Sequence, residues 1–454
     1  VALGGVKATN LSATIPDYLK EKLLIDADVK GPGKAVGPYF KDTPLKETLS
    51  TALDELQLDG EVNARLHLDI PLDGEMTTAK GDVTLNHNNL FIKPINSTVN
   101  DLRGKFSFVN GNLKSEPLQA TWFNQPLNID FTTTEGEKAY QVAVNLNGNW
   151  QPARTGVLPQ QLNNALSGSF GWKGKVDIDL PYRSGAKYAV NIDGDLTNIA
   201  SKLPPPMDKQ PGKALPVKLK VEGNLHSFDL TGSAGSTNHF NSRWLLNSKL
   251  TLDRAIWASD SDTLPPLPDE EGVELNLPAM NGAQWLALFR QGVASNVSDS
   301  TAFPSRITLR TPALTLAGQQ WNNLSLVSKP QSSGSVIEAQ GREINGTLTL
   351  RDNAPWEAAI RYLYYNPAAA VSEDNDISSP TTLLSGKSQV DFSGWPDLRL
   401  RCAECWRWGQ KYGRIDGDVD IKGDTLTLTK GLVDTGFARL TADGEWVNRT
   451  SGER

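Results

Sequence analysis

Apolar and polar residues alternate with a period of two along most of this 454-residue chain. Between Val62 and Ile70, for example, an apolar side chain occupies every second position, and polar or charged side chains fill most of the positions between. Successive side chains of a β-strand point to opposite faces, so such segments predict strands with one apolar and one polar face. Gly, Asn and Asp separate many of them, as in residues 109–113, which is typical of tight hairpins. We therefore predict an all-β, mainly antiparallel protein.

Helices are predicted in only a few places. The strongest candidate spans 43–57, where a threonine cap and a proline precede a stripe of apolar residues with helical spacing. Shorter amphipathic stretches predict helices at 16–24, 159–166 and 282–290. We expect these few short helices to cap or plug the edges of a sheet.

Three stretches without regular alternation interrupt the strands. Residues 202–213 and 259–272 are rich in proline, and 366–380 is a polar loop. These stretches divide the chain into four predicted parts. In chain order these are a first β block with the 43–57 helix (1–200), strands 214–258 flanked by Pro-rich linkers (201–272), a further β block with the short 282–290 helix (273–365), and a C-terminal β repeat after the loop (366–454).

Charge and motif content narrow the functional classes. A formal net charge of −7 argues against a nucleic-acid surface, which needs clustered lysine and arginine. The chain has no run of 18 apolar residues, so we expect no membrane-spanning helix in it. The four histidines are scattered, and the motifs of phosphate loops, dinucleotide sites and metalloproteases are missing. We therefore predict no enzyme activity, no catalytic residue, no metal and no cofactor.

Cys402 and Cys405 are the only two cysteines, and they are three positions apart. A zinc site needs about four ligands, and no second cysteine or histidine pair complements this one. A thioredoxin-type redox pair normally lies at a helix N-terminus, whereas this stretch is strand-like. Two interpretations are left, a structural disulfide or two packed thiols. Residues i and i+3 of an extended strand are about 10 Å apart, while a disulfide needs Cα atoms within roughly 7 Å, so a bonded pair requires a turn or bulge at 403–404.

Strands with one apolar face fit two architectures. In a sandwich or barrel the apolar faces pack against one another. In an open, curved sheet the apolar face instead lines a trough that something apolar must fill. The alternation by itself fits both, and the missing catalytic motifs favour the trough.

Several stretches resemble the AsmA-like family. Residues 39–74, where a helix opening with Asp-Thr-Pro-Leu is followed by Leu-Asp-Gly and a strand ending in Ile-Pro-Leu, resemble the central region of these proteins. Residues 102–129 fit the strands that follow, 275–289 resemble the short helix inserted before a new strand group, and 395–432 resemble the repeated unit. The resemblance covers nearly the whole chain. It implies a repeating-β-groove, bridge-like lipid carrier, in which a long, curved and twisted sheet forms an open apolar groove.

The resemblance also implies a location and partners. Members of the family are anchored in the inner membrane and are implicated in moving phospholipid to the outer membrane, so we expect an internal, periplasmic bridge segment of a longer protein. Its expected partners are phospholipid acyl chains along the groove and envelope proteins at either end of the full-length bridge. We expect a monomer that conducts lipid passively and contacts membranes only through parts outside this chain. An oxidising periplasm favours a disulfide between Cys402 and Cys405.

The predicted groove lining consists of apolar residues from the alternating segments. They are Val62, Leu66, Leu68, Ile70, Val83, Leu85, Phe106, Phe108, Val142, Val144, Leu146, Val217, Leu219, Ile307, Leu309, Leu398, Leu400, Val419, Ile421, Leu426 and Leu428.

Two other functions stay open at this point. A structural or scaffolding β protein of the envelope has paired apolar faces and a dry core. A carbohydrate-active enzyme needs two carboxylates roughly 5–10 Å apart in one cleft.

Overall fold

A computed structural model describes residues 2–3, 6–16, 21–35, 56–156, 160–285, 301–302, 304–367, 396–423 and 425–447. Within these ranges the protein is all-β, and nearly all strand pairs are antiparallel, so the predicted fold class is confirmed. Helical segments are short: α3 (Gln160–Ala165) and the 3₁₀ turns η1 (Gly33–Ala35), η2 (Lys93–Ile95) and η3 (Pro152–Arg154). No helix in the described ranges has the length and hydropathy needed to cross a bilayer.

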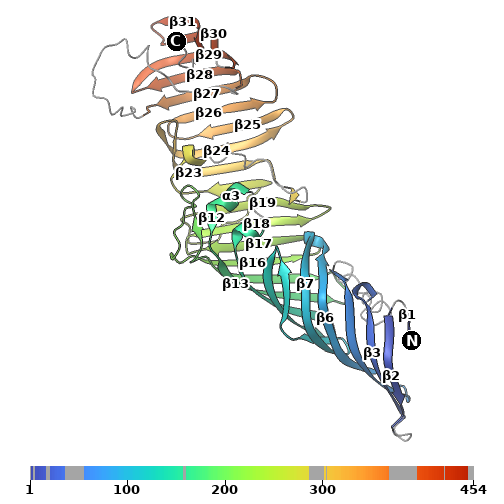
Figure 1. Ribbon diagram of the computed structural model, residues 1–454. Helices are drawn as coiled ribbons and strands as arrows, with labels where there is room; N and C mark the ends of the chain where they lie inside the picture. Colours follow the sequence, from blue (N-terminus) through green and yellow to red (C-terminus); the bar gives the residue numbers. More distant parts are fainter. Residues whose placement is uncertain are drawn as a thin grey trace, which may run out of the picture. The chain divides into compact units, whose positions relative to one another are not determined.

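The chain divides into two compact units. The first comprises the described residues of 1–267 and 288–303, and the second those of 268–287 and 304–454. Within each unit, the strands largely follow one another across a twisted sheet in chain order, as the colour gradient of Figure 1 shows. The division into four blocks at the Pro-rich linkers stays a prediction.

The strands of the first unit are mostly long and joined by short turns. They are β1 (Ala2–Leu3), β2 (Val6–Thr14), β3 (Lys22–Pro32), β4 (Leu56–Asp59), β5 (Glu61–Pro71), β6 (Thr78–Ile92), β7 (Ser97–Val109), β8 (Asn112–Ser115), β9 (Leu118–Trp122), β10 (Gln125–Glu135), β11 (Ala139–Trp150), β12 (Leu166–Ser167), β13 (Phe170–Pro181), β14 (Lys187–Asp195), β15 (Ala200–Ser201), β16 (Pro216–Asn224), β17 (Ser227–Ala234), β18 (Asn238–Leu246), β19 (Leu250–Ala258) and β22 (Thr301–Ala302). The hairpin predicted at 109–113 joins β7 to β8, with Val109 opposite Asn112 and Asn110 at a positive φ of 52°. β12 and β15 form a separate two-stranded sheet.

The second unit contains eleven strands within the described residues. They are β20 (Gly272–Asn276), β21 (Met280–Asn281), β23 (Ile307–Leu316), β24 (Gln319–Gln331), β25 (Gly334–Gln340), β26 (Ile344–Arg351), β27 (Trp356–Tyr365), β28 (Leu398–Arg407), β29 (Gln410–Lys422), β30 (Thr425–Asp434) and β31 (Arg439–Val447). β27 pairs with β28 in parallel. A parallel pair needs a crossover connection of a dozen or more residues, and the non-periodic stretch between these two strands is long enough to supply it.

The predicted helices have different outcomes. α3 confirms the helix at 159–166. The helix at 43–57 and nearly all of the loop at 366–380 lie outside the described residues; of the helix at 282–290, residues 282–285 are described and helical. Of the helix at 16–24, residues 17–20 lie outside the described residues, and its end is wrong because residues 22–24 belong to β3 and pair with β5. There, pairing with a neighbouring strand outweighs the local amphipathic pattern.

Apolar side chains on the sheet are mostly half-buried. Along β16, for example, exposed and half-buried residues alternate over nine positions without one enclosed side chain. Sandwich packing would enclose one face against a second sheet about 10 Å away. The rings of Phe106 on β7 and Phe131 on β10 have centroids only 5.6 Å apart, although β8 and β9 lie between these strands. The sheet of the first unit is therefore a single layer that curves toward its apolar face.

Candidate functional site

Three rows of directly paired residues cross the first unit from β10 to β19 on the same face of the sheet. We call this face, with its continuation on β3 to β9, the apolar face of the first unit. The rows are Ile129, Leu146, Gly174, Ile192, Leu219, Gly232, Phe240 and Trp257; Phe131, Val144, Val176, Val190, Val221, Leu230, Ser242 and Ala255; and Thr133, Val142, Ile178, Tyr188, Gly223, Phe228, Trp244 and Leu252. Tyr188 is the one ionisable residue in these rows, and burial raises its pKa to about 12. The rows are therefore uncharged at any physiological pH.

Similar rows continue toward the N-terminal strands. They are Gly31, Val62, Leu85 and Gly104; Val29, Ala64, Val83 and Phe106; and Ala27, Leu66, Gly81 and Phe108. Leu68 lies between Ile25 and Ala79 in the next row, and Ile70 lies opposite Leu23. Because the pairing register aligns every second residue, the alternation seen in separate segments becomes one apolar surface.

The second unit has an apolar face of the same construction. One row consists of Leu275, Leu309, Leu326, Ala339, Gly346, Ile360, Cys402, Ile415, Val433 and Leu440. Leu398 lies opposite Val419, which lies opposite Leu428, and Ile421 lies opposite Leu426. Leu400 lies between Ala358 and Gly417.

All 21 residues predicted to line a groove therefore lie on the apolar face of their own unit. Val62 and Leu85 are buried, and Ile307 is 44% exposed. The other eighteen are half-buried. Such intermediate burial is what a single curved layer gives, because each side chain is covered by neighbours on its own face and leaves part of its surface open.

Aromatic rings lie low on the apolar face because glycines stand opposite them. Phe240 faces Gly232, where an added Cβ would lie 2.6 Å from the phenyl Cζ. Phe108 faces Gly81, where the corresponding distance to two ring carbons is 2.9 Å. Any larger residue at these glycines would collide with the ring. Each ring thus occupies the space over a bare stretch of backbone instead of standing upright on the sheet.

Aromatic residues on neighbouring strands also stack in parallel. The rings of Phe228 and Trp244 have centroids 6.0 Å apart and planes 9° apart. Phe240 and Trp257 repeat this arrangement at 5.7 Å and 6°. The two stacked pairs place four aromatic rings on the apolar face across β17, β18 and β19.

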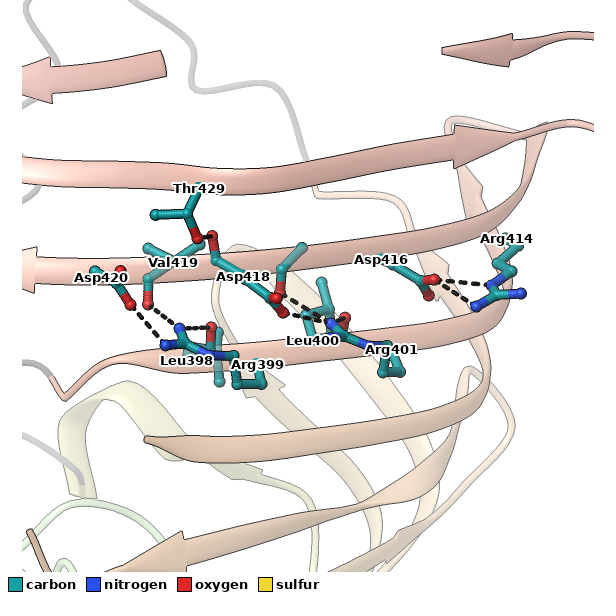
Figure 2. A network of polar contacts seen from close by, with 11 residues as sticks. Leu398, Arg399, Leu400, Arg401, Arg414, Asp416, Asp418, Val419, Asp420 and Thr429 are labelled. Atoms are coloured by element: carbon teal, nitrogen blue, oxygen red, sulfur yellow. Dashed lines mark hydrogen bonds and ion pairs between the residues drawn. The ribbon is translucent and has the colours of Figure 1, made fainter. Parts of the chain in front are cut away.

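The opposite face of each sheet is polar and carries ion pairs. In the second unit, Arg399 and Arg401 on β28 lie 2.7 Å from carboxylate oxygens of Asp420 and Asp418 on β29, as Figure 2 shows. The hydrogen bond and positive charge of Arg401 lower the pKa of the Asp418 carboxyl below its usual value. In the first unit, Arg243 binds both carboxylate oxygens of Asp229, at 2.8 and 3.0 Å. The two faces are therefore chemically distinct, because one carries charged side chains and the other is apolar.

Cys402 and Cys405 are joined in a disulfide, with Cα atoms 6.1 Å apart. β28 shifts its register against β29 between them, so that Cys402 faces Ile415 and Cys405 faces Gly413. Three steps along one strand thus match two along the other, which is a β-bulge. The two cysteines are only 1% and 6% exposed. The disulfide therefore joins the two sides of the bulge within the sheet, and neither cysteine has a free thiol.

Sequence reasoning missed apolar-face residues that the structure adds. Val176 and Val190 belong to the same row as the predicted Val144, and the alternation in their strands was a sufficient signal. Trp150 and Trp172 lie in the main apolar cluster beside Leu146, with ring centroids 4.8 Å apart. Their place beside the rows depends on pairing register, which no local pattern reveals. No cluster of His, Cys, Asp or Glu suited to a metal ion occurs in the part of the chain that the structure describes.

Comparison with known proteins identifies a family for this chain. The model of the family described as "YhdP protein" matches residues 1–454. The chain belongs to the YhdP family. A curated relative from Escherichia coli K12, named intermembrane phospholipid transporter YhdP, is 66% identical over 454 residues. The aligned region is 100% of this chain and 36% of that YhdP protein, so the chain spans about a third of its relative's length. No solved structure matches the chain.

Proposed function

We propose that this chain is a segment of a phospholipid conduit, in which acyl chains travel along the apolar faces while head groups stay in water. The observation that carries the proposal is the set of uncharged rows on the first unit, which extend over successive strands from β10 to β19. Neighbouring strands are about 4.8 Å apart, so such rows give a path and not a single pocket. The transfer is passive and needs no chemical step.

The energetics favour a continuous path. Exposing an acyl chain to water costs about 0.8 kcal/mol per CH₂, and therefore roughly 20 kcal/mol for the two chains of one phospholipid. An apolar surface whose side chains are mostly half-buried lowers this barrier without holding the lipid at one position. A structural β protein with a dry core would instead enclose these side chains, and none of the nine residues of β16 is enclosed.

The relative's name supports the cargo and the place. That protein is named as an intermembrane phospholipid transporter, and the corresponding place for this segment is the periplasm, between the inner and outer membranes. The longer protein would provide the inner-membrane anchor and the ends that meet other envelope proteins. The segment itself acts as a monomer, with phospholipid acyl chains as its main partner.

Photocrosslinking tests the path directly. A crosslinking amino acid placed at Val144 or Leu219, on the apolar face, is expected to capture phospholipid in the full-length protein in cells. The same amino acid at Asn147 or Glu222, on the polar face of the same strands, is expected to capture none. Mass spectrometry of the purified 454-residue chain is expected to find bound phospholipid. Crosslinks confined to the polar face, or equal on both faces, would refute the proposal.

A further inference from the structure

Few side chains in the three rows from β10 to β19 carry a polar hydrogen, and most of these donate it within the protein. The hydroxyls of Thr133 and Ser242 donate to backbone carbonyls, at 3.1 and 3.2 Å. The indole N–H groups of Trp244 and Trp257 donate to serine hydroxyls, at 3.0 and 3.1 Å. The exception is Tyr188, whose hydroxyl makes no hydrogen bond in the described ranges. It is therefore the one free donor in these rows.

The other described tyrosines of the first unit differ from Tyr188 in this respect. The hydroxyl of Tyr140 donates to the carbonyl of Gly111 at 2.7 Å, and that of Tyr182 donates to the carbonyl of Gly136 at 3.0 Å. Burial raises the pKa of Tyr188 to about 12, so its hydroxyl is partly withdrawn from water as well. A polar group that loses water without gaining a partner costs free energy, and a ligand that accepts its hydrogen removes that cost.

Tyr188 lies at the border between the apolar face and water. It is the second residue of β14, in the row nearest the hairpins that join β10 to β11, β13 to β14 and β16 to β17. Residues 183–185 of the adjoining hairpin are exposed. The residues directly opposite Tyr188 are Ile178 and Gly223, and the glycine has no side chain to cover the ring. When acyl chains follow the rows, the glycerol part of a phospholipid lies at this border.

We propose that the hydroxyl of Tyr188 donates a hydrogen bond to an ester carbonyl oxygen of the phospholipid that passes over β14. This inference rests on the proposed conduit and adds a position at which the lipid backbone is recognised as well as its chains. Each ester carbonyl joins an acyl chain to the glycerol, so it is the first acceptor oxygen beyond the apolar rows. One neutral hydrogen bond changes affinity only about fivefold, which orients the lipid without trapping it.

Competition between two lipids tests this contact. A photocrosslinking amino acid is placed at Val190, two positions along the apolar face of the same strand. Vesicles contain equal amounts of diacyl phosphatidylethanolamine and its dialkyl ether analogue, which has the same head group and chain length but no carbonyl oxygen. Mass spectrometry of the crosslinked 454-residue chain measures the ratio of the captured lipids. We expect about fivefold more diacyl than dialkyl lipid, the effect of one hydrogen bond.

Two variants assign this preference to one hydroxyl. Tyr188→Phe removes only the hydroxyl, and we expect it to capture the two lipids equally. Tyr182→Phe is the matched control, because the hydroxyl of Tyr182 already donates to Gly136, and its preference is expected to stay that of the unsubstituted chain. A purely structural disturbance would reduce the capture of both lipids and leave their ratio unchanged.

The outcomes separate this inference from the conduit itself. Equal capture of both lipids by the unsubstituted chain, or a preference that persists in Tyr188→Phe, would overturn the role of Tyr188, while the captured lipid would still support the conduit. Capture of neither lipid at Val190 would overturn the conduit and this inference with it.

The stability of the lipid-free chain provides a second test. Tyr188→Phe removes a hydroxyl without a protein partner, so the midpoint of denaturant unfolding is expected to stay unchanged or to rise. Tyr140→Phe is expected to lower this midpoint, because the buried hydroxyl of Tyr140 donates to the carbonyl of Gly111. Equal decreases in the two variants would show that the hydroxyl of Tyr188 bonds within the folded protein, and would overturn the proposal.

Discussion

A single charge on the apolar face is expected to block lipid movement without unfolding the sheet. Val144→Asp is the most informative change, because Val144 lies between Phe131 and Val176 in the middle of an uncharged row. β11 is paired along its length with β10 and β13, so its backbone hydrogen bonds are unaffected. Val144 is half-buried, and the carboxylate stays hydrated when no lipid covers it. We expect a loss of about 1 kcal/mol in the free energy of unfolding, a common value for a point substitution.

The effect on lipid is larger. An acyl chain that passes over position 144 must strip water from the carboxylate, and an aspartate in a hydrocarbon environment costs about 3 kcal/mol. Each 1.36 kcal/mol of added barrier slows a step about tenfold. We therefore expect the rate at which lipid passes this point to fall by about a hundredfold.

The assay measures extraction of fluorescent phospholipid from vesicles by the 454-residue chain. Asn147→Asp is the matched control on the polar face of the same strand. Its carboxylate would still accept the hydrogen bond that Asn128 donates at 3.1 Å, and Lys173 lies directly opposite. We expect normal extraction by this control. Circular dichroism verifies that both variants keep their β structure. If folded Val144→Asp extracts lipid as fast as Asn147→Asp does, the apolar rows are not the path.

Three further predictions concern stability. Gly232→Val is expected to lower the free energy of unfolding by about 1–3 kcal/mol, the range for overpacking. The reason is that a Cβ at this position would lie 2.4 Å from a backbone oxygen of β16. An unchanged midpoint of denaturant unfolding would contradict this close contact. Replacing Cys402 and Cys405 together with alanine is expected to lower the free energy of unfolding by about 2 kcal/mol, because the unfolded chain regains the entropy of the short loop. Calorimetry of the variant and of the oxidised chain measures this, and no difference would show that the disulfide does not stabilise the bulge. Arg401→Gln is expected to raise the pH at which the second unit unfolds in acid: Arg401 lowers the folded-state pKa of Asp418, so its stabilisation is present above the unfolded pKa of about 3.9 and is lost as pH falls. Circular dichroism between about pH 2 and 5 checks this shift, and an equal midpoint would refute it.

Much of the candidate site was visible in local pattern. The segments around Val62, Val144 and Val217 have one apolar and one polar face in the sequence, and the structure gives them the same faces. The prediction succeeded because side-chain direction in a strand depends only on position along it. It failed at residues 22–24, where a short amphipathic pattern suggested a helix and β5 provides a strand partner instead.

The cysteines show the limit of what the local sequence pattern predicts. Their spacing allowed a disulfide only if the strand bulged, and two interpretations fitted the residues equally. The bulge depends on the register of β28 against β29, in which Cys402 lies opposite Ile415 and Cys405 opposite Gly413, and the pattern within β28 does not specify that register.

By itself, the sequence determined that this chain makes β-strands and which side of each is apolar, because a period of two is a local property of the strand. Only the tertiary structure decided that these sides join into continuous rows, that glycines stand beneath Phe108 and Phe240, and that the apolar face of the first unit stays half-open instead of meeting a second sheet. Those features depend on which strands pair, in what register and with what curvature, and each of these is set by contacts between residues of different strands.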